Sequence, residues 1–403
     1  MQVSARYKAV LELLEEIFKD KKPADNILND YLRARKYIGS KDRRFITETV
    51  WKIIRNRLKL SFDINSKHPR DILLCFVKDE NLSEIFDDSQ YGLDSLTVQE
   101  EKKLKEINEN PYPAYVELET PLWLYDKIKD DKLLRALNST ASADFRINAS
   151  NRDIVIAELK GEGYDFIKTP YSPIGIRSEN RISLPNCIAY KEGKIDVQDE
   201  ASQIVSLLCD VKESDKIVDY CSGAGGKALT LSFLLKNKGK IQVHDIDWHR
   251  LEQIKPRIER LGVQNIEICR EITDEDYDIF IIDAPCSGTG TWRRSPDAKF
   301  RLTKDKLEEL NKIQLNLLKT AYAHTKVGGK IIYITCSVLK DENESIILNF
   351  LNENNMVSLL NIKNIFENKI KHPYLAKDEF MLRLSPYQTD CDGFFMSIFE
   401  KKE

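Results

Sequence analysis

The chain has 403 residues, a formal net charge of −3, and hydrophobic and charged shares of 42% and 32%. These values are typical of a soluble globular protein with two or three domains, so any nucleic-acid contact must come from local basic patches. No apolar run is long enough to cross a bilayer, and the first residues lack the pattern of a secretory signal. Eight cysteines without CxxC pairs and five scattered histidines predict a reducing cytoplasm and no structural zinc.

Residues 1–140 are expected to form an all-helical domain. Apolar side chains recur at helical spacing in three segments, Val10–Phe18, Ile27–Leu32 and Phe45–Leu58. Thr97 and Glu100 have the spacing of a capping box, which predicts the start of a later helix.

Prolines interrupt the end of this domain. Pro111 and Pro113 predict a linker over residues 108–120. The pair Thr120-Pro121 then predicts a helix that Thr120 caps and in which Pro121 takes the first position.

Residues 141–196 are expected to form a small α/β subdomain. Asp144–Asn148 reads as a strand and Asp153–Lys160 as a helix. Short strand-like pieces follow at Ile182 and Ile188, before Gly193–Val197. We expect this subdomain to pack on the part of the chain that comes next.

Residues 197–403 are expected to form the third and largest domain. Strand and helix patterns alternate along it, which predicts a doubly wound, mostly parallel sheet in an α/β fold. The strand candidates are Ile217–Asp219, Ile241–Val243, Ile266–Ile268, Asp278–Ile282, Lys330–Ile334 and Phe394–Phe399.

Two cysteines follow two of these strands. Cys286 comes shortly after Asp278–Ile282, and Cys336 shortly after Lys330–Ile334. Because the carboxyl ends of neighbouring strands in an open α/β sheet converge on one crevice, both thiols could face the same small molecule. This predicts an enzyme that attacks its substrate covalently through sulfur. The spacing alone does not decide which cysteine attacks.

A glycine-rich turn, residues 221–227, would line the same crevice. Gly223, Gly225 and Ala228 fit the dinucleotide-binding fingerprint, and Asp245 follows at the end of the next strand, where a carboxylate can accept hydrogen bonds from ribose hydroxyls. Nicotinamide, flavin and S-adenosylmethionine enzymes share this arrangement. The alternative is a tight strand-to-helix connection that binds no ligand.

Several longer motifs resemble those of the RNA cytosine-5 methyltransferases, and specifically the bacterial RsmB or Sun (Fmu) group that acts on 16S ribosomal RNA. The resemblance implies a Rossmann-like class I S-adenosylmethionine methyltransferase domain at 197–403, preceded by a NusB-like RNA-binding domain at 1–140 and the small α/β subdomain at 141–196. The motifs that carry it are VQDEAS at 197–202, CSGAGGK at 221–227, VHDID at 243–247, DAPCSGTG at 283–290, RSPD at 294–297, TCSVLKDEN at 335–343 and DGFF at 392–395.

The resemblance also implies a role for each site residue. Cys336 would be the nucleophile that adds to carbon 6 of cytosine, and Cys286 the thiol that helps to break down the covalent adduct. Asp283 would hydrogen-bond the cytosine edge and border the cofactor. The residues implied to hold S-adenosyl-L-methionine are Cys221, Ser222, Gly223, Ala224, Gly225, Gly226, Lys227, Asp245 and Asp283.

One departure from the family pattern concerns the adenine. Relatives usually carry a Gly-Asp pair after the third strand of this domain, and here the segment reads Cys269 to Asp274 without that pair. Glu271 or Asp274 could take over the adenine contact. The sequence does not decide between them.

The resemblance favours 16S ribosomal RNA as the partner, with no membrane and no metal, and we expect a cytoplasmic monomer. Two alternatives remain: a transfer RNA cytosine-5 methyltransferase, and a non-catalytic RNA-binding factor in ribosome assembly. An NAD-dependent oxidoreductase is less consistent, because it has no use for the two cysteine motifs.

Two further expectations concern single residues. Cysteines outside the motifs usually behave as small buried hydrophobic residues, which we expect for Cys75, Cys187, Cys209 and Cys391. Basic residues follow the Cys286 motif directly, where they could contact RNA phosphates. They are Arg293, Arg294, Lys299 and Arg301.

Overall fold

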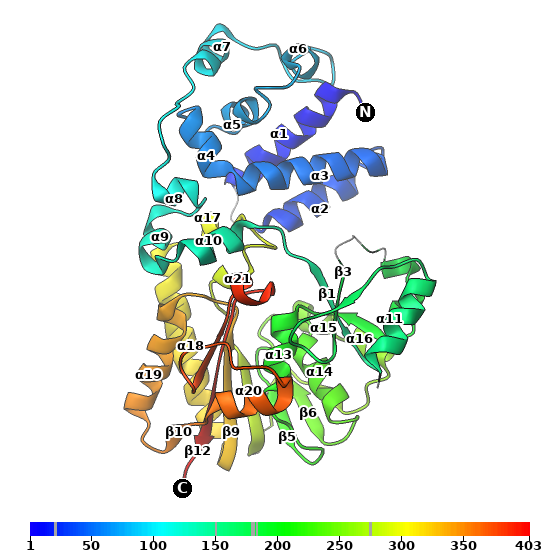
Figure 1. Ribbon diagram of the computed structural model, residues 1–403, viewed down its shortest axis with the longest axis vertical. Helices are drawn as coiled ribbons and strands as arrows, with labels where there is room; N and C mark the ends of the chain where they lie inside the picture. The colour runs from blue at the N-terminus through cyan, green and yellow to red at the C-terminus, as the bar shows by residue number, and fades with distance from the viewer. Residues whose placement is uncertain (20–21, 150, 179–181, 183, 274–275) are drawn as a thin grey trace. The chain divides into compact units, whose positions relative to one another are not determined.

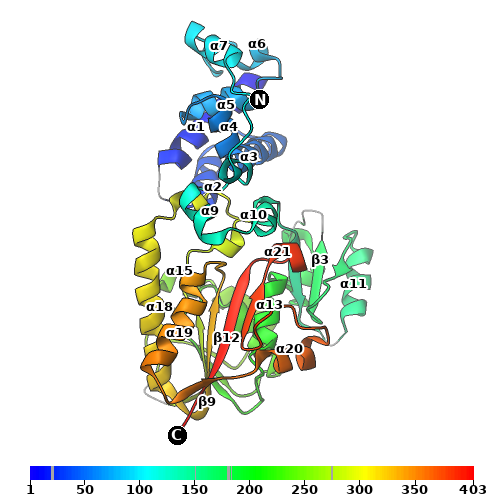
Figure 2. The same cartoon turned by 60° about the vertical axis from the view of Figure 1, so that its left-hand side comes forward.

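The computed structural model describes residues 1–19, 22–149, 151–178, 182, 184–273 and 276–403. The chain divides into two compact units (Figures 1 and 2). The helical unit comprises Met1–Ser139 and Trp292–Leu302, and the α/β unit comprises Thr140–Thr291 and Thr303–Glu403. No helix in the described part of the chain combines the length and the apolar character that a bilayer crossing requires.

The helical unit is built around one apolar core. Leu13 and Leu14, Ile53 and Leu73 come from three of its helices, and all four side chains are fully buried. The helices are α1 (Val3–Lys19), α2 (Ala24–Ala34), α3 (Ser40–Arg55), α4 (Arg57–Asp63), α5 (Pro69–Phe76), α6 (Leu82–Ile85), α7 (Val98–Lys105), α8 (Ala114–Glu117), α9 (Leu122–Ile128), α10 (Asp131–Asn138) and α17 (Ala298–Arg301).

The helical periodicity of the sequence is confirmed in α1, α2 and α3, and so is the capping box. The Thr97 hydroxyl accepts a hydrogen bond from the Glu100 amide, while the Glu100 carboxylate accepts one from the Thr97 amide. The linker expected over 108–120 is wrong in part, since it contains α8. Thr120 does not cap α9: its hydroxyl donates to the Leu118 carbonyl at 2.9 Å, and the helix begins after Pro121.

The segment Trp292–Leu302 is held by side-chain contacts within the helical unit. The Ala24 amide donates to Asp297 at 3.1 Å, and Lys299 Nζ donates to Asn138 at 2.8 Å. Burial lowers the pKa of Lys299 to about 7. Arg293 and Lys299 are buried, at 4% and 1% exposure, so the expectation that these two contact RNA is wrong.

The α/β unit begins with a small antiparallel sheet in the order β2-β3-β1-β4. The expected strand and helix are present as β1 and α11. Ile188 starts a helix rather than a strand, and Ile182 lies outside any described strand. The elements are β1 (Ala143–Ile147), α11 (Arg152–Gly161), β2 (Ile167–Lys168), β3 (Gly175–Ser178), α12 (Ile188–Lys191) and β4 (Ile195–Val197), with a 3₁₀ turn at Leu184–Asn186.

The large sheet has the order β10-β12-β9-β8-β5-β6-β7, and β11 pairs with β12. The strands from β9 to β7 are parallel, whereas β12 runs antiparallel to β9, and both β10 and β11 run antiparallel to β12. The strands are β5 (Lys216–Asp219), β6 (Lys240–Val243), β7 (Ile266–Ile268), β8 (Tyr277–Asp283), β9 (Thr325–Thr335), β10 (Val357–Leu359), β11 (Met381–Leu384) and β12 (Phe394–Lys401). The expected doubly wound, mostly parallel sheet is confirmed, while β10 and β11 were not expected.

Helices cover both faces of this sheet (Figures 1 and 2). Alternate strand residues point to opposite faces, so Ile217 and Ile279 pack with α13, α14 and α20, whereas Val218 and Phe280 pack with α18 and α19. The helices are α13 (Glu200–Leu207), α14 (Gly226–Leu234), α15 (Trp248–Glu252), α16 (Lys255–Leu261), α18 (Lys304–His324), α19 (Glu344–Glu353), α20 (Ile362–Ile370) and α21 (Pro386–Thr389), with 3₁₀ turns at Thr289–Thr291 and Lys340–Glu342.

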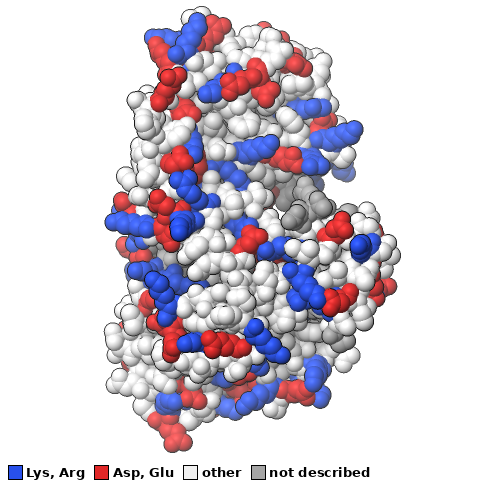
Figure 3. Space-filling view, viewed as in Figure 1, with Lys and Arg blue, Asp and Glu red and all other residues white. Residues whose placement is uncertain are grey.

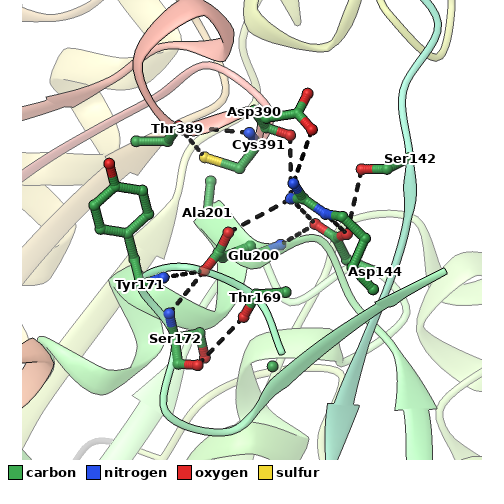
Figure 4. A network of polar contacts seen from close by, with 12 residues as sticks. Ser142, Asp144, Thr169, Tyr171, Ser172, Glu200, Ala201, Thr389, Asp390 and Cys391 are labelled. Atoms are coloured by element: carbon green, nitrogen blue, oxygen red, sulfur yellow. Dashed lines mark hydrogen bonds and ion pairs between the residues drawn. The ribbon is translucent and has the colours of Figure 1, made fainter. Parts of the chain in front are cut away.

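A buried charge network joins the small sheet to the rest of the α/β unit (Figure 4). Arg177 of β3 binds Asp144 of β1 at 2.6 Å and Asp390, at the end of α21, at 2.8 Å, and it lies 3.5 Å from Glu200 at the start of α13. Glu200 also accepts hydrogen bonds from the backbone amides of Tyr171 and Ser172, both at 2.7 Å. Because a buried charge is costly without partners, this network fixes three distant segments to one another.

Candidate active site

The structure brings Cys286 and Cys336 together. They follow β8 and β9, which are neighbouring parallel strands in a register that pairs Asp283 with Ile334. The two sulfur atoms lie 3.4 Å apart, both cysteines are free, and both are partly exposed. A pair of thiols this close can share a proton and can act on the same substrate atom or its neighbour.

Backbone hydrogen bonds fix the two cysteine segments to the start of β12. The Gly290 amide donates to the Cys336 carbonyl at 2.9 Å, and the Gly393 amide donates to the Gly290 carbonyl at 2.8 Å. A Cβ atom at Gly290 would lie 2.0 Å from the Gly393 carbonyl oxygen. Glycine at position 290 is therefore required by the close approach of two backbones, which explains part of the motif DAPCSGTG.

Glu342 holds the segment that carries Cys286. Its fully buried carboxylate accepts hydrogen bonds from the Ser287 amide at 2.8 Å, from the Ser287 hydroxyl and from Gln314 Nε2 at 3.1 Å. The contact with the Cys336 thiol, burial and the negative charge of Glu342 raise the pKa of Cys286 well above that of a free thiol. Cys286 is therefore held as a protonated thiol.

Sequence reasoning did not assign a role to Glu342 or Gln314. Glu342 belongs to the motif TCSVLKDEN, so its place in that motif could have marked it. Gln314 lies in the long helix α18, where nothing in the sequence distinguishes it.

Lys227 and Asp283 connect the glycine turn to the cysteine strands. Lys227 lies in the first turn of α14, and its Nζ atom is 2.6 Å from the Asp283 carboxylate. Burial disfavours the charged form of Lys227, but Asp283 outweighs this effect and the pKa of Lys227 is raised. In the structure the Lys227 ammonium therefore neutralises Asp283 at the edge of the site.

The glycine turn adopts a conformation that only glycine tolerates well. Gly223 and Gly225 have φ values of +55° and +78°, and a Cβ atom at Gly225 would lie 2.1 Å from Ile254 Cδ1. The Gly223 amide donates to Asp245 at 2.7 Å, which ties the turn to the carboxylate at the end of the next strand. Glycine at both positions lets the turn lie directly against the side chains of Arg250 and Ile254.

Asp219, at the end of β5, is a second carboxylate that sequence reasoning missed. It is fully buried and accepts a hydrogen bond from the Ser222 hydroxyl at 2.9 Å. Burial, reinforced by the nearby Asp283 carboxylate, raises the pKa of Asp219 to about 7. Asp219 is therefore largely protonated at acid pH and supports the turn as a neutral group.

The structure bears on three further expectations, which concern the adenine contact, metal binding and the burial of four cysteines. Asp274 lies outside the described residues, and Glu271 is exposed in the loop after β7. Within the described ranges, no three His, Cys, Asp or Glu side chains are grouped as metal ligands would be. The expected burial of four cysteines is confirmed: Cys75, Cys187, Cys209 and Cys391 are at most 2% exposed.

A parallel sheet with this glycine turn and the paired carboxyl-end residues defines an α/β fold of the methyltransferase type. Residues 206–400 match the profile of the family 16S rRNA methyltransferase RsmB/F. The match begins at residue 206, so the NusB-like character of the helical unit stays a prediction.

Curated relatives agree with the family. Over 222 residues the chain is 31% identical to the probable ribosomal RNA small subunit methyltransferase B of Bacillus subtilis, covering 53% of this chain and 49% of the relative. Over 300 residues it is 27% identical to the ribosomal RNA small subunit methyltransferase B of Proteus mirabilis, covering 70% of this chain and 66% of the relative. The chain thus spans about half to two thirds of the length of these relatives.

Solved structures share the fold. The crystal structure of PH0851 superposes with a TM-score of 0.76 and 25% sequence identity, covering 98% of each chain. NSun6 from Pyrococcus horikoshii, crystallised with SFG, superposes with a TM-score of 0.60 and 18% identity, covering 70% of this chain and 97% of that one.

The charge of Glu342 should be measurable at Cys286. In Glu342→Gln the negative charge is lost, so the Cys286 thiolate becomes easier to form and the pH profile of its alkylation by iodoacetamide should shift to lower pH. The rates can be followed by peptide mass spectrometry. Glu353→Gln, which removes a half-exposed carboxylate at the end of α19, is the matched control and should leave the profile unchanged. An unshifted profile in Glu342→Gln would contradict the assigned electrostatic effect.

Asp219 should make folding stability depend on pH. Between the ordinary carboxyl pKa of 3.8 and about 7, the folded protein keeps a proton that the unfolded chain has lost, so this group's contribution to stability falls as pH rises. Asp219→Asn lacks this titration. As pH rises, the free energy of unfolding of the variant, measured with urea, should increase relative to that of the wild type. The difference should grow by up to about 1.4 kcal/mol per pH unit. Curves that stay parallel, as expected for the exposed Asp276→Asn control, would refute the assignment.

Proposed function

We propose that this protein transfers a methyl group from S-adenosyl-L-methionine to carbon 5 of a cytosine in small-subunit (16S) ribosomal RNA. The observation that carries the proposal is the pair of free thiols 3.4 Å apart at the ends of β8 and β9. Covalent activation of cytosine uses one thiol for attack and a second for release. The relatives named above, all described as ribosomal RNA small subunit methyltransferases, support the substrate class.

Cytosine carbon 5 must be activated before it can take a methyl group. We assign this step to Cys336, whose sulfur adds to carbon 6 and converts the ring into an enamine-like species with a nucleophilic carbon 5. Asp283 borders the same crevice and would hydrogen-bond the base edge, which favours protonation of the ring as the sulfur adds. Lys227, 2.6 Å from Asp283, would hold that carboxylate in place.

The adduct must then be broken down. Loss of the carbon 5 proton restores the ring double bond, and the carbon 6–sulfur bond breaks with its electron pair returning to Cys336. Cys286, whose sulfur lies beside that of Cys336, would accept this proton as a thiolate after its own thiol proton has passed to solvent. Glu342 acts through Cys286 as a positioning residue, because it fixes the Ser287 backbone.

When bound, S-adenosyl-L-methionine supplies the electrophilic methyl group. The residues present fit this cofactor, since Gly223 and Gly225 add no side chain to the turn and the Asp245 carboxylate, bound to the Gly223 amide, would accept hydrogen bonds from the ribose. Ile246, beside Asp245, is 98% exposed, and this apolar side chain could cover the adenine that the missing Gly-Asp pair would otherwise contact. The fold shared with NSun6, crystallised with the S-adenosylmethionine analogue SFG, supports the same cofactor.

Two other substrates or roles fit parts of the structure. A transfer RNA substrate would keep the whole chemical mechanism, and a non-catalytic assembly factor would keep the fold. A cytoplasmic monomer stays our prediction for the state of the protein.

The proposal is tested by transfer of labelled methyl from S-adenosyl-L-methionine to unmodified small-subunit ribosomal RNA, with transfer RNA in parallel. We expect label in 5-methylcytosine at one ribosomal site, mapped by sequencing. Label on transfer RNA alone would overturn the substrate, and no label on free RNA or on an assembling small subunit would favour the non-catalytic factor.

The two cysteines should fail in different ways. Cys336→Ala should abolish methyl transfer without forming an adduct, because the attacking sulfur is absent. Cys286→Ala should still attack the RNA and accumulate a protein–RNA adduct stable on denaturing gels. Cys187→Ala, a buried thiol of the small subdomain, is the control and should form no lasting adduct. If Cys336→Ala traps the adduct and Cys286→Ala does not, the two roles are reversed.

A further inference from the structure

The helical unit contains a cavity of about 760 Å³ that the proposed chemistry does not use. It opens between the first turns of α1 and the end of α2. Its volume lies within the range of sites that hold a nucleotide-sized ligand. Three tyrosines line it, Tyr31, Tyr37 and Tyr91.

Two of these tyrosines are exposed to an unusual degree. Tyr37 is 75% exposed and Tyr91 is 69% exposed, so neither ring contributes to the core of the helical unit. Tyr31 is different: its hydroxyl donates to Glu12 at 2.6 Å, and the Arg35 guanidinium lies 3.6 Å from its ring centroid. The cavity thus has one fixed aromatic wall and two free aromatic rings.

Two basic side chains and one carboxylate line the same cavity. Lys8 and Arg35 line it, and Lys36 is exposed between Arg35 and Tyr37. Neither Lys8 nor Lys36 forms an ion pair within the described part of the chain, whereas the lining carboxylate of Glu12 lies 3.7 Å from Arg35. Lysine and arginine side chains project from the end of the helical unit where α1 and α3 begin (Figures 1 and 3).

We propose that this cavity binds an unpaired nucleotide of an RNA strand. Exposed aromatic rings beside lysine and arginine are the usual means of holding single-stranded RNA, since every base can stack and every phosphate is negative. A base stacks on Tyr37 or Tyr91, and Lys8 contacts the neighbouring phosphate. The Glu12 carboxylate accepts a hydrogen bond from an exocyclic amino group. The inference rests on the proposed function only in taking RNA as the substrate.

The site would lie outside the catalytic crevice, on the unit that carries no cysteine motif. Its role would be to hold a single-stranded part of the RNA while another part reaches Cys336. Removing the rings should therefore weaken RNA binding and raise KM for RNA, and it should leave kcat unchanged at saturating RNA.

The test uses the full chain and a short fluorescein-labelled single-stranded RNA of mixed sequence, with a duplex of that sequence for comparison. In the double variant Tyr37→Ala/Tyr91→Ala we expect the Kd for the single strand, measured by anisotropy, to rise by about tenfold or more. Tyr37→Phe/Tyr91→Phe keeps both rings and should stay within about twofold of wild type. Because both side chains are exposed, neither pair of changes removes core packing.

Two further readouts locate the effect. Lys8→Ala should reduce the slope of log Kd against log salt by about 0.7, as expected for the loss of one phosphate contact to a single strand. Ultraviolet crosslinking of the RNA should label peptides that contain Tyr37 or Tyr91. Tyr387→Ala, which removes a 47% exposed tyrosine of the α/β unit, is the control and should change neither Kd nor crosslinking.

The outcomes separate this inference from the proposed function. An unchanged Kd in the double alanine variant, with no crosslink at either tyrosine, overturns the nucleotide site even if the wild type methylates ribosomal RNA. A raised Kd in a protein that transfers no methyl group supports the site and overturns the enzyme. If the double alanine variant binds free RNA normally and loses activity only on an assembling particle, the occupant is a protein and the inference is wrong.

Discussion

The parallel pairing of β8 with β9 is the constraint on which the rest of the site depends. It brings two chain segments that are fifty residues apart in sequence to the same edge of the sheet, where Asp283 and Ile334 are in register. Every other feature of the crevice either fixes this pairing or uses it. Backbone hydrogen bonds from the Gly290 amide to the Cys336 carbonyl and from the Gly393 amide to the Gly290 carbonyl continue beyond the strands. They form one layer of three loops that are fixed to one another.

Buried carboxylates give this layer its rigidity. Glu342 gathers donors from the Cys286 segment and from α18, Asp219 supports the glycine turn, and Glu200 joins the small sheet to α13. Glu342 and Glu200 each accept two or more hydrogen bonds, whereas Asp219 accepts one from a hydroxyl and its second buried oxygen has no partner within the described part of the chain. Burial and, after it, the negative charge of Asp283 raise the pKa of Asp219, and Asp283 itself binds Lys227.

Patterns that depend on local chemistry could be predicted from the sequence. The helices α1 to α3, the Thr97 capping box, the parallel strands and the convergence of two thiols follow from periodicity, caps and strand ends. What failed depends on distant partners. The apolar segment at Ile188 forms a helix, and the three-residue strand β10 pairs with the distant β12. The role of Glu342 depends on its hydrogen bond from the Ser287 amide, fifty-five residues away.

Basic residues gave the sharpest disagreement between sequence and structure. Charge alone suggested that Arg293 and Lys299 face RNA, yet both are buried in the helical unit. Local sequence cannot show this, because Asn138 and Arg55, which bind the Lys299 side chain and the Arg293 carbonyl, lie more than a hundred residues earlier.

The place of Trp292–Leu302 has a consequence for how such a protein can be divided. The chain passes from the helical unit to the α/β unit, returns for eleven residues and leaves again. A fragment that begins at Thr140 would carry Phe300 without the helical core against which it packs. The helical unit is therefore not encoded by one continuous stretch of sequence. A gene cut after Ser139 yields two incomplete pieces. Recombination could exchange the unit only by moving both of its stretches together.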